Sequence, residues 1–350
     1  MTASRKDDHV RLASEQWRQP TTANEFDDVA FVHHALAGID RSDVSLGVEF
    51  AGIRWGTPLY INAMTGGSEL TGKINRELAI AARETGLAIA AGSLSAYLKD
   101  ESCADTFRVI RKEHPDGFVM ANINARTRVA DARRVIDLLE ADALQIHLNA
   151  VQEIVMPEGD REFASWAGQI ERIRTAVDVP VIVKEVGFGL SGETACRLAE
   201  LGVDAIDVGG RGGTDFAAIE NGRRDDADFA YLAGWGQSTP AALLDCAGAT
   251  NLPILASGGV RTPLDVVRGL ALGATAVGSS GCFLKTVLDG GPDALVRHIS
   301  TWLDRITVLL TVLGARTPSD CVRCDLVLTG TLRAFCEARG IDVRGYGHRA

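Results

Sequence analysis

The sequence predicts an α/β fold, a (β/α)8 TIM barrel in which eight parallel strands close on themselves inside a ring of helices. Two observations predict this architecture. Short apolar runs rich in β-branched residues alternate along the 350 residues with longer amphipathic segments, which is typical of a parallel sheet with helices outside it. Eight such runs follow one another with no antiparallel interruption, which favours a closed barrel over an open, doubly wound sheet.

The expected strands and helices follow from these two patterns. The strands are expected at residues 58–63, 87–91, 118–121, 143–148, 180–186, 205–208, 253–256 and 274–277. Apolar residues at positions i, i+3 and i+4 predict helices at residues 74–85, 130–140, 163–177, 194–201 and 263–272. Most of these helices are followed by Gly or Asp before the next strand. The segment before residue 58 and the tail after residue 284, with a helix at 296–313, are expected to flank the barrel.

Composition excludes several classes of protein. Hydrophobic residues make up 46% and charged residues 23%, which is ordinary for a globular chain. No apolar run reaches the roughly 18 to 20 residues that a membrane-spanning helix needs, and the charged start is unlike a signal peptide, so we expect a cytoplasmic protein. The net charge of −10 argues against a nucleic-acid partner. The seven cysteines are expected to be reduced, and Cys321 and Cys324, spaced like a metal or redox pair, lack a second pair of ligands.

The ends of the last two predicted strands are rich in glycine. Residues 257–261 read Ser-Gly-Gly-Val-Arg, and residues 278–281 read Gly-Ser-Ser-Gly. In barrel enzymes this is where backbone N–H groups and a helix N-terminus bind phosphate, so we expect a phosphate site there, aided by Arg261. The alternative is that the glycines only make tight turns.

Lys184 ends the fifth predicted strand, after three consecutive β-branched residues. Burying a lysine there is costly without a partner, and a flavin-binding barrel places a cation at this point, beside N1 and O2 of the flavin ring. The alternative is a structural ion pair with a carboxylate of the barrel such as Asp207. Thr65 and Thr214 lie beside paired glycines and could donate hydroxyl hydrogen bonds to a flat ring.

The fourth strand end gathers amide, imidazole and carboxylate side chains. The period of two places His147 and Asn149 on one face, and Gln152 and Glu153 follow at once. A carboxylate beside an amide suits Mg²⁺ that in turn holds a diphosphate. The alternative, equally compatible with the spacing, is that Glu153 caps the following helix.

The amino terminus carries a charged patch that includes Arg5, Lys6 and His9. One interpretation is a frayed, solvated end. The other is a lid that folds over the barrel mouth and delivers Arg5 and Lys6 to phosphate oxygens, which would supply the positive charge that the overall balance lacks.

Taken in order, these motifs resemble type 2 isopentenyl diphosphate isomerase, the flavin-dependent form, essentially from end to end. The segments that carry the likeness are Arg5-Lys6 with His9, Met64 to Gly67, Gly92-Ser93, Asn122, His147 to Asn149 with Gln152-Glu153, Lys184 to Gly187, Gly210 to Thr214, and Ser257 to Arg261. Two departures are Leu94-Ser95, where many members have Gln and often Arg, and Gly209, where some have Ser. They put phosphate contacts at those two points in doubt.

The resemblance implies interconversion of isopentenyl and dimethylallyl diphosphates with reduced FMN, Mg²⁺, and NAD(P)H only as the reductant of the flavin. It implies that FMN contacts Ala63, Met64, Thr65, Ser93, Asn122, Lys184, Thr214, Gly259, Val260, Arg261, Ser280 and Gly281. It assigns substrate binding to Arg5, Lys6, Ser93, His147, Asn149 and Gln152, and the metal to Glu153. Lys184, Gln152 and His147 are expected to serve the reaction, in which the reduced flavin itself is acid and base because no side chain is an obvious acid for an alkene.

The same likeness sets the expected organisation of the chain. Residues 1–56 would form an N-terminal substrate-capping segment, 57–285 the FMN-binding barrel, and 286–350 a C-terminal helical extension of it. A homotetramer or homooctamer is expected.

The competing interpretations each lack a residue or leave one unexplained. An FMN-dependent α-hydroxy acid oxidase or dehydrogenase needs a histidine base after the sixth strand, and residues 210–213 supply none. An inosine-monophosphate-dehydrogenase-like enzyme would need a cysteine within residues 204–222, which contain none. A flavin-binding sensor or scaffold would not need Gln152, Glu153 and the basic terminus.

Overall fold

The computed structural model describes residues 2–18, 24–36, 39–224, 226 and 228–349, except for the side chains of residues 2–5. Its centre is a closed barrel of eight parallel strands that pair in the order β10-β11-β4-β5-β6-β7-β8-β9, so each strand lies beside its neighbour in sequence. These strands are β4 (Leu59–Ile61), β5 (Ala88–Ala90), β6 (Val119–Asn124), β7 (Ala143–Leu148), β8 (Val181–Glu185), β9 (Ala205–Asp207), β10 (Ile254–Ser257) and β11 (Ala276–Ser279). All eight predicted strands are confirmed.

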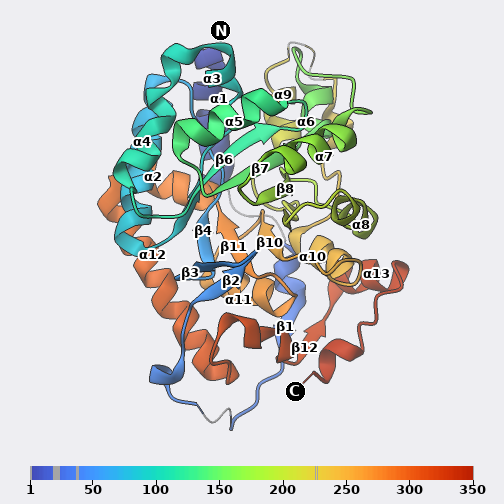
Figure 1. Ribbon diagram of the computed structural model, residues 1–350. Helices are drawn as coiled ribbons and strands as arrows, with labels where there is room; N and C mark the ends of the chain where they lie inside the picture. The colour runs from blue at the N-terminus through green and yellow to red at the C-terminus, as the bar shows by residue number, and fades with distance from the viewer. Residues whose placement is uncertain (1, 19–23, 37–38, 225, 227, 350) are drawn as a thin grey trace.

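Helices surround the barrel (Figure 1). They are α2 (Glu69–Thr85), α3 (Ser95–Lys99), α4 (Asp105–Glu113), α5 (Val129–Leu139), α6 (Ala150–Val155), α7 (Trp166–Ala176), α8 (Gly192–Glu200), α9 (Phe216–Asn221), α10 (Thr239–Ala247), α11 (Pro263–Ala271) and α12 (Gly281–Leu313). Helix α2 shows how local sequence sets the ends of a helix. Ser68 forms a capping box at its start, and Gly86, in the left-handed conformation, ends it. Helix α10 was not predicted, since its residues are buried on almost every side and show no amphipathic period.

The chain that precedes the barrel packs against both of its ends. Helix α1 (Thr2–Arg18) lies at the top of Figure 1, among α3 and α9. Strands β2 (Val48–Phe50) and β3 (Ile53–Trp55) form a hairpin. Its residues Phe50 and Trp55 pack against interior residues of the barrel such as Tyr60 and Met120, and so close the barrel at the amino-terminal ends of its strands. Of the described residues before the barrel, 2–18 border the mouth and 48–55 plug the base.

The chain after the barrel packs along its side. Helix α12 crosses the expected boundary at residue 285 and is interrupted at Gly291, whose φ of 70° is non-helical, just before Pro292. Further on, β12 (Leu326–Leu328) pairs antiparallel with β1 (Val29–Phe31), and α13 (Gly330–Ala338) follows. The short 3₁₀ helices are η1 (Glu25–Asp28), η2 (Arg41–Asp43), η3 (Glu101–Cys103), η4 (Ala230–Leu232), η5 (Pro318–Arg323) and η6 (Gly345–Gly347).

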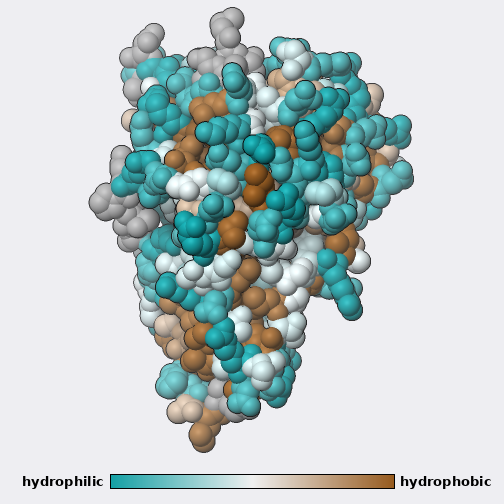
Figure 2. All heavy atoms as spheres, turned by 90° about the vertical axis from the view of Figure 1, so that its left-hand side faces the viewer, coloured by the Kyte–Doolittle hydropathy of each residue, from teal (hydrophilic) through white to brown (hydrophobic). Residues whose placement is uncertain are grey.

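The surface over α2, α4 and α12 is mostly hydrophilic in its upper part, while apolar residues gather in its lower part (Figure 2). Exposed apolar side chains of α12 include Leu288, Val308 and Val312. Among the described residues, none of the helices is both long enough and apolar enough to cross a membrane.

Candidate active site

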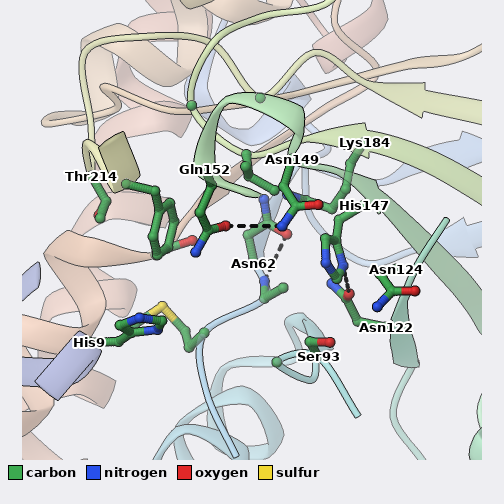
Figure 3. Close-up of a pocket in the computed structure, with 18 of the residues that line it drawn as sticks. His9, Asn62, Ser93, Asn122, Asn124, His147, Asn149, Gln152, Lys184 and Thr214 are labelled. Carbon is green, nitrogen blue, oxygen red and sulfur yellow. Dashed lines mark hydrogen bonds between the residues drawn. The ribbon is translucent and has the colours of Figure 1, made fainter. Parts of the chain in front are cut away.

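A cavity of about 740 Å³ opens at the carboxyl ends of the barrel strands, and all eight strand ends contribute to its wall (Figure 3). The residues that were expected at the site and line this cavity are Lys6, Ala63, Met64, Thr65, Ser93, Asn122, His147, Asn149, Gln152, Glu153, Lys184, Thr214, Gly259, Val260, Ser280 and Gly281. The structure thus brings together residues that are up to 275 positions apart in the sequence, between Lys6 and Gly281.

The glycine-rich strand ends are built from closely packed backbone. Gly258 and Gly259 have φ values of 96° and 69°, which other residues rarely adopt. A Cβ atom on Gly258 would overlap the Gly210 carbonyl, so the loops after β9 and β10 touch each other through glycine. Close packing explains part of the glycine content, and the same loops present bare backbone to the cavity.

Two buried hydroxyl oxygens in the cavity wall have no hydrogen-bond partner among the residues that the structure describes. They are Thr65 Oγ1, in the loop after β4, and Ser279 Oγ, at the end of β11. A buried polar atom without a partner is costly, and a ligand with complementary groups would satisfy both. Together with the glycine backbone, these atoms fit a phosphate-bearing aromatic cofactor such as FMN.

Lys184 is buried at the end of β8, with only 6% of its surface exposed. Its Nζ donates to the Glu185 carbonyl at 2.7 Å rather than to Asp207, whose carboxylate accepts from Tyr60 at 2.9 Å and Ser257 at 2.8 Å. Burial lowers the pKa of Lys184, while the nearby charges of Asp207 and Glu185 oppose that change. The lysine is therefore held in the cavity wall without the ion pair that was its structural alternative.

The fourth strand end forms a hydrogen-bonded cluster. Asn149 Nδ2 donates to Gln152 Oε1 at 3.2 Å and to Glu153 Oε1 at 2.9 Å. The second oxygen of Glu153 accepts the backbone N–H of Asp160 at 2.8 Å, so its carboxylate ties α6 to the following loop and does not cap the helix. Two carboxylate oxygens with one amide donor each retain lone pairs for a cation.

His147 lies beside this cluster, at the end of β7. Its Nδ1 is 2.7 Å from Asn122 Oδ1. Burial, together with the charges of Lys184 and Lys6, lowers the pKa of His147 to about 3. The imidazole is therefore neutral across the physiological pH range.

Helix α1 covers one side of the cavity, as the lid hypothesis expects. Lys6, His9 and Trp17 line it, while the side chain of Arg5 lies outside the described part of the chain. The helix is held from below by Gln16, which donates to the Asp215 carbonyl at 3.1 Å and accepts the Asp215 N–H at 3.0 Å. In the structure this segment is a helix that packs beside the cavity.

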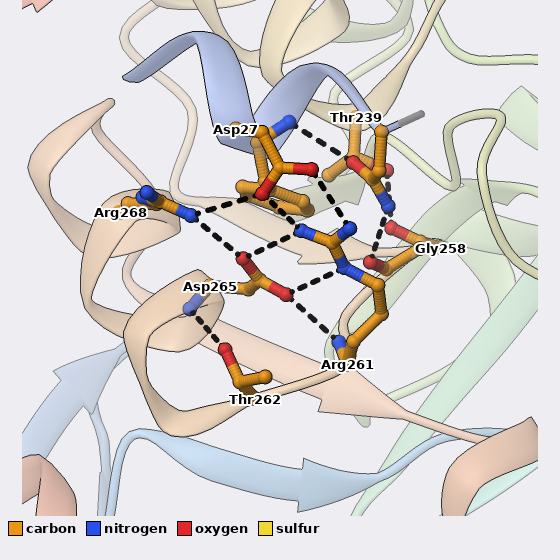
Figure 4. Close-up of polar contacts among 10 residues, drawn as sticks. Asp27, Thr239, Gly258, Arg261, Thr262, Asp265 and Arg268 are labelled. Carbon is orange, nitrogen blue, oxygen red and sulfur yellow. Dashed lines mark hydrogen bonds and ion pairs between the residues drawn. The ribbon is translucent and has the colours of Figure 1, made fainter. Parts of the chain in front are cut away.

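Arg261 is the described site residue that the structure does not bring to the cavity (Figure 4). Its guanidinium bonds both oxygens of Asp27, at 2.9 and 2.7 Å, and Asp265 at 3.0 Å. Its backbone N–H donates to Asp265 at 3.1 Å. The structure thus gives the Arg261 side chain to two carboxylates that join η1 to α11, and the expected phosphate contact stays a prediction.

The residues in or beside the cavity wall that were not predicted from sequence include Asn62, Trp17 and Glu220. Asn62 directly follows β4, where a polar residue in an apolar run was a usable signal. Trp17 packs against Gly281, where a Cβ atom would overlap the indole. Glu220 is fully buried below α1, within 3.0 Å of His9 Nε2 and of Gln152 Nε2. No local sequence pattern marks Trp17 or Glu220. The partner of Trp17, Thr214, lies 197 positions away, and the partners of Glu220 lie on other elements.

Comparison with known proteins gives the family. The profile of the FMN-dependent dehydrogenase family matches residues 121–327, more than half of the chain. An isopentenyl-diphosphate delta-isomerase of Streptomyces sp. (strain CL190) is 66% identical over 349 residues, which cover 100% of this chain and 96% of the relative. The chain belongs to the isopentenyl-diphosphate delta-isomerase family. A more distant isomerase, from Latilactobacillus sakei subsp. sakei (strain 23K), is 46% identical and covers 97% of both chains.

Membership of the isomerase family agrees with the resemblance to its flavin-dependent type 2 form. Among solved structures, a lactate oxidase of Pediococcus acidilactici superposes with a TM-score of 0.68 over 94% of this chain and 93% of its own, at 17% identity. At that identity the likeness concerns the fold alone. The chain is therefore a member of the isomerase family whose fold is shared with this oxidase.

Proposed function

We propose that this protein interconverts isopentenyl diphosphate and dimethylallyl diphosphate with FMN bound in the cavity. The observation that supports this most strongly is the single cavity wall that joins glycine-rich strand ends, a buried lysine and an amide–carboxylate cluster beneath a lid helix. The first two suit a flavin, and the last two suit a diphosphate with a divalent cation.

The flavin would lie against the strand ends. Reduced FMN, when bound, supplies the acid and base of the allylic proton shift. We assign its contacts to Ala63, Met64, Thr65, Ser93, Asn122, Lys184, Thr214, Gly259, Val260, Ser280 and Gly281, and omit Arg261 for the reason given above. Lys184 would hold positive charge beside the ring in a buried site, where charge interactions are strong.

The diphosphate would lie between α1 and α6. Lys6, with Arg5 from the same helix, would bind phosphate oxygens, and Asn149, Gln152 and His147 would line its other side together with Ser93. Glu153 would hold Mg²⁺ bridging to the diphosphate. This division leaves the protein the tasks of orienting the substrate and excluding water, which lower the barrier without a covalent step.

Two further assignments complete the proposal. NAD(P)H would reduce the flavin and take no other part, because the isomerisation has no net redox change. The chain would form a homo-oligomer, a tetramer or an octamer, and the exposed apolar residues Val308 and Val312 of α12 are suited to an interface. Light scattering of the purified protein would measure its mass.

The test is an anaerobic assay of the purified protein with isopentenyl diphosphate, NADPH and Mg²⁺. We expect a yellow protein that forms dimethylallyl diphosphate only when FMN, reductant and Mg²⁺ are all present. Isomerisation that persists after removal of the flavin and the reductant would contradict the proposal. Oxidation of lactate or mandelate in the same preparation would instead favour the α-hydroxy acid oxidase, which shares the barrel.

A further inference from the structure

A chain of side-chain amides crosses the interior of the barrel below the cavity and joins Asp207 to His147; Figure 3 labels three of its members, Asn62, Asn122 and His147. Asn62 Nδ2 donates to Asp207 Oδ2 at 3.0 Å, and Gln145 Nε2 donates to Asn62 Oδ1 at 3.4 Å. Asn122 Nδ2 donates to Gln145 Oε1 at 3.1 Å, and its own Oδ1 meets His147 Nδ1 at 2.7 Å. We call Asn62, Gln145 and Asn122 the amide chain.

The direction of the amide chain is fixed at its Asp207 end. A carboxylate only accepts hydrogen bonds, so the amide group that meets Asp207 is the NH₂ of Asn62. The Oδ1 atom of Asn62 also accepts the backbone N–H of Ala63 at 2.8 Å, and a backbone amide cannot reverse its role. Asn62 is therefore held with its oxygen toward Gln145.

Each amide then orients the next one. Gln145 Nε2 lies between Asn62 Oδ1 and Met120 Sδ at 3.7 Å, which are both acceptors, so its oxygen faces Asn122. Asn122 in turn presents its oxygen to His147. Asn62 and Asn122 are each 3% exposed and Gln145 is fully buried, so these amides depend on one another for their hydrogen bonds.

The amide chain contacts His147 at one atom, Nδ1. A neutral imidazole has one N–H, and an obligatory acceptor beside Nδ1 favours the proton there. The low pKa of His147, caused by burial and by Lys184 and Lys6, keeps the ring neutral and makes the choice between tautomers meaningful.

We propose that Asp207, acting through the amide chain, fixes His147 in the Nδ1–H tautomer and leaves Nε2 as a hydrogen-bond acceptor. Asn62, Gln145 and Asp207 are then positioning residues. Gln145 in particular is fully buried and acts on the cavity only through its neighbours.

This tautomer restricts what His147 can bind, a consequence that rests on the proposed function. Ionised diphosphate oxygens only accept hydrogen bonds, as Nε2 does in this tautomer. His147 can therefore pair with the diphosphate only through an oxygen that carries a proton, through a water molecule, or after the ring gains a second proton.

The test is ¹⁵N NMR of the FMN-loaded protein labelled at histidine, recorded without diphosphate. The signals of His147 are assigned by their loss in His147→Asn. We expect Nδ1 to have the shift of a protonated nitrogen and Nε2 that of an unprotonated one. The Ile123 backbone carbonyl also interacts with the ring, and protonation at Nε2 would overturn the proposal.

A variant pair tests the amide chain itself. Gln145→Met removes both of its amide hydrogen bonds at similar volume, and we expect the signals to shift toward a mixture of the two tautomers. Met120→Leu repacks the same place and removes only the long sulfur contact of Gln145 at 3.7 Å; the bonds of Gln145 to Asn62 and Asn122 remain, so this variant should keep Nδ1–H. An unchanged tautomer in Gln145→Met would show that the chain does not set it, and the wild-type spectrum decides the tautomer even where that variant fails to fold. Because no substrate is present, failure of the isomerase reaction would leave this result untouched.

Discussion

At the scale of single residues, the cavity holds two nitrogen bases side by side in different electrostatic surroundings. His147 and Lys184 are paired in register across β7 and β8. Burial lowers the pKa of both groups, but the neighbours differ, since Lys184 has Asp207 and Glu185 nearby whereas His147 has Lys184 and Lys6. The carboxylates favour the charged form of the lysine, and the lysines disfavour the charged form of the histidine. The neutral form is therefore favoured more strongly at His147 than at Lys184, where the two carboxylates oppose the effect of burial.

The first prediction at this scale concerns the activity of a Glu153 variant. Glu153→Gln keeps the length of the side chain and an oxygen for Asn149 or Asp160, but it removes the charge that would bind Mg²⁺. We expect kcat/KM for isopentenyl diphosphate to fall on the order of 100-fold or more, because changes even to the residues around a metal ligand cost 10- to 100-fold. Bound FMN should be retained, as measured by the flavin absorbance of the purified variant.

The matched control is Glu162→Gln, an exposed acid on the same loop. It should leave both turnover and flavin content unchanged. A colourless Glu153→Gln would place Glu153 in the flavin site instead of the metal site.

At the scale of elements, α1 is attached to the barrel through Glu220 of α9. This carboxylate is fully buried and meets His9 of α1, Gln152 of α6 and Arg223. Burial alone would raise the pKa of Glu220, but the hydrogen bonds and charges of His9, Gln152 and Arg223 outweigh it and lower the pKa to about 2. Helix α1, the hydrogen-bonded cluster after β7 and helix α9 are thus joined at one carboxylate.

The lowered pKa predicts how stability depends on pH. A carboxyl group with a folded-state pKa of about 2 against an ordinary 4.5 stabilises the folded state above pH 4.5, and this contribution is lost as pH falls from 4.5 toward 2. Glu220→Gln should lower the free energy of unfolding by roughly 3 kcal/mol at pH 7. The difference from wild type should narrow below pH 4.5, as measured by urea unfolding at a series of pH values.

Glu158→Gln is the control for this experiment. Glu158 pairs with the same Arg223, but its side chain is 46% exposed, so we expect a change under about 1 kcal/mol. A difference for Glu220→Gln that stays constant from pH 7 to pH 3 would mean that its ionisation is not what attaches the lid.

The second prediction at the scale of elements concerns the contribution of Arg261 to stability. Arg261 joins η1 to α11 through Asp27 and Asp265, and Asp265 is 1% exposed at its side chain. Arg261→Met should destabilise the fold by about 3 kcal/mol, the lower end of the cost of breaking a buried pair, because Arg268 still meets Asp265 at 3.1 Å. Thermal unfolding of the flavin-free protein measures this. A fold of unchanged stability combined with lost FMN affinity would return Arg261 to the phosphate site.

At the scale of the whole molecule, the barrel could be predicted because its signals are local and repeated. Each strand is an apolar run and its end is polar, so the eight strand ends, and with them Lys184, His147 and Thr65, followed from sequence order alone. The fate of Arg261 could not be predicted, since its partner Asp27 lies 234 positions away. Nor could the plug formed by Phe50 and Trp55, because an apolar hairpin does not reveal which end of the barrel it covers.

The last prediction concerns the thermal stability that the protein gains when FMN binds in the cavity. Unpartnered Thr65 Oγ1 and Ser279 Oγ and the bare backbone of Gly258 and Gly259 should all gain partners when FMN binds. At 100 times its dissociation constant, FMN should stabilise the fold by about 2.7 kcal/mol, which raises Tm by roughly 4 °C for a chain of this length. Differential scanning fluorimetry of the flavin-free protein measures the shift.

Riboflavin provides the matched comparison, because it has the same ring without the phosphate. If the ends of β10 and β11 bind the phosphate, riboflavin at equal concentration should raise Tm far less than FMN does, since the backbone N–H groups at those ends would gain no anion. Equal shifts from the two compounds would mean that the ring alone provides the affinity. The glycines at these strand ends would then serve the close packing of the loops, as Gly258 does against Gly210, and not a phosphate.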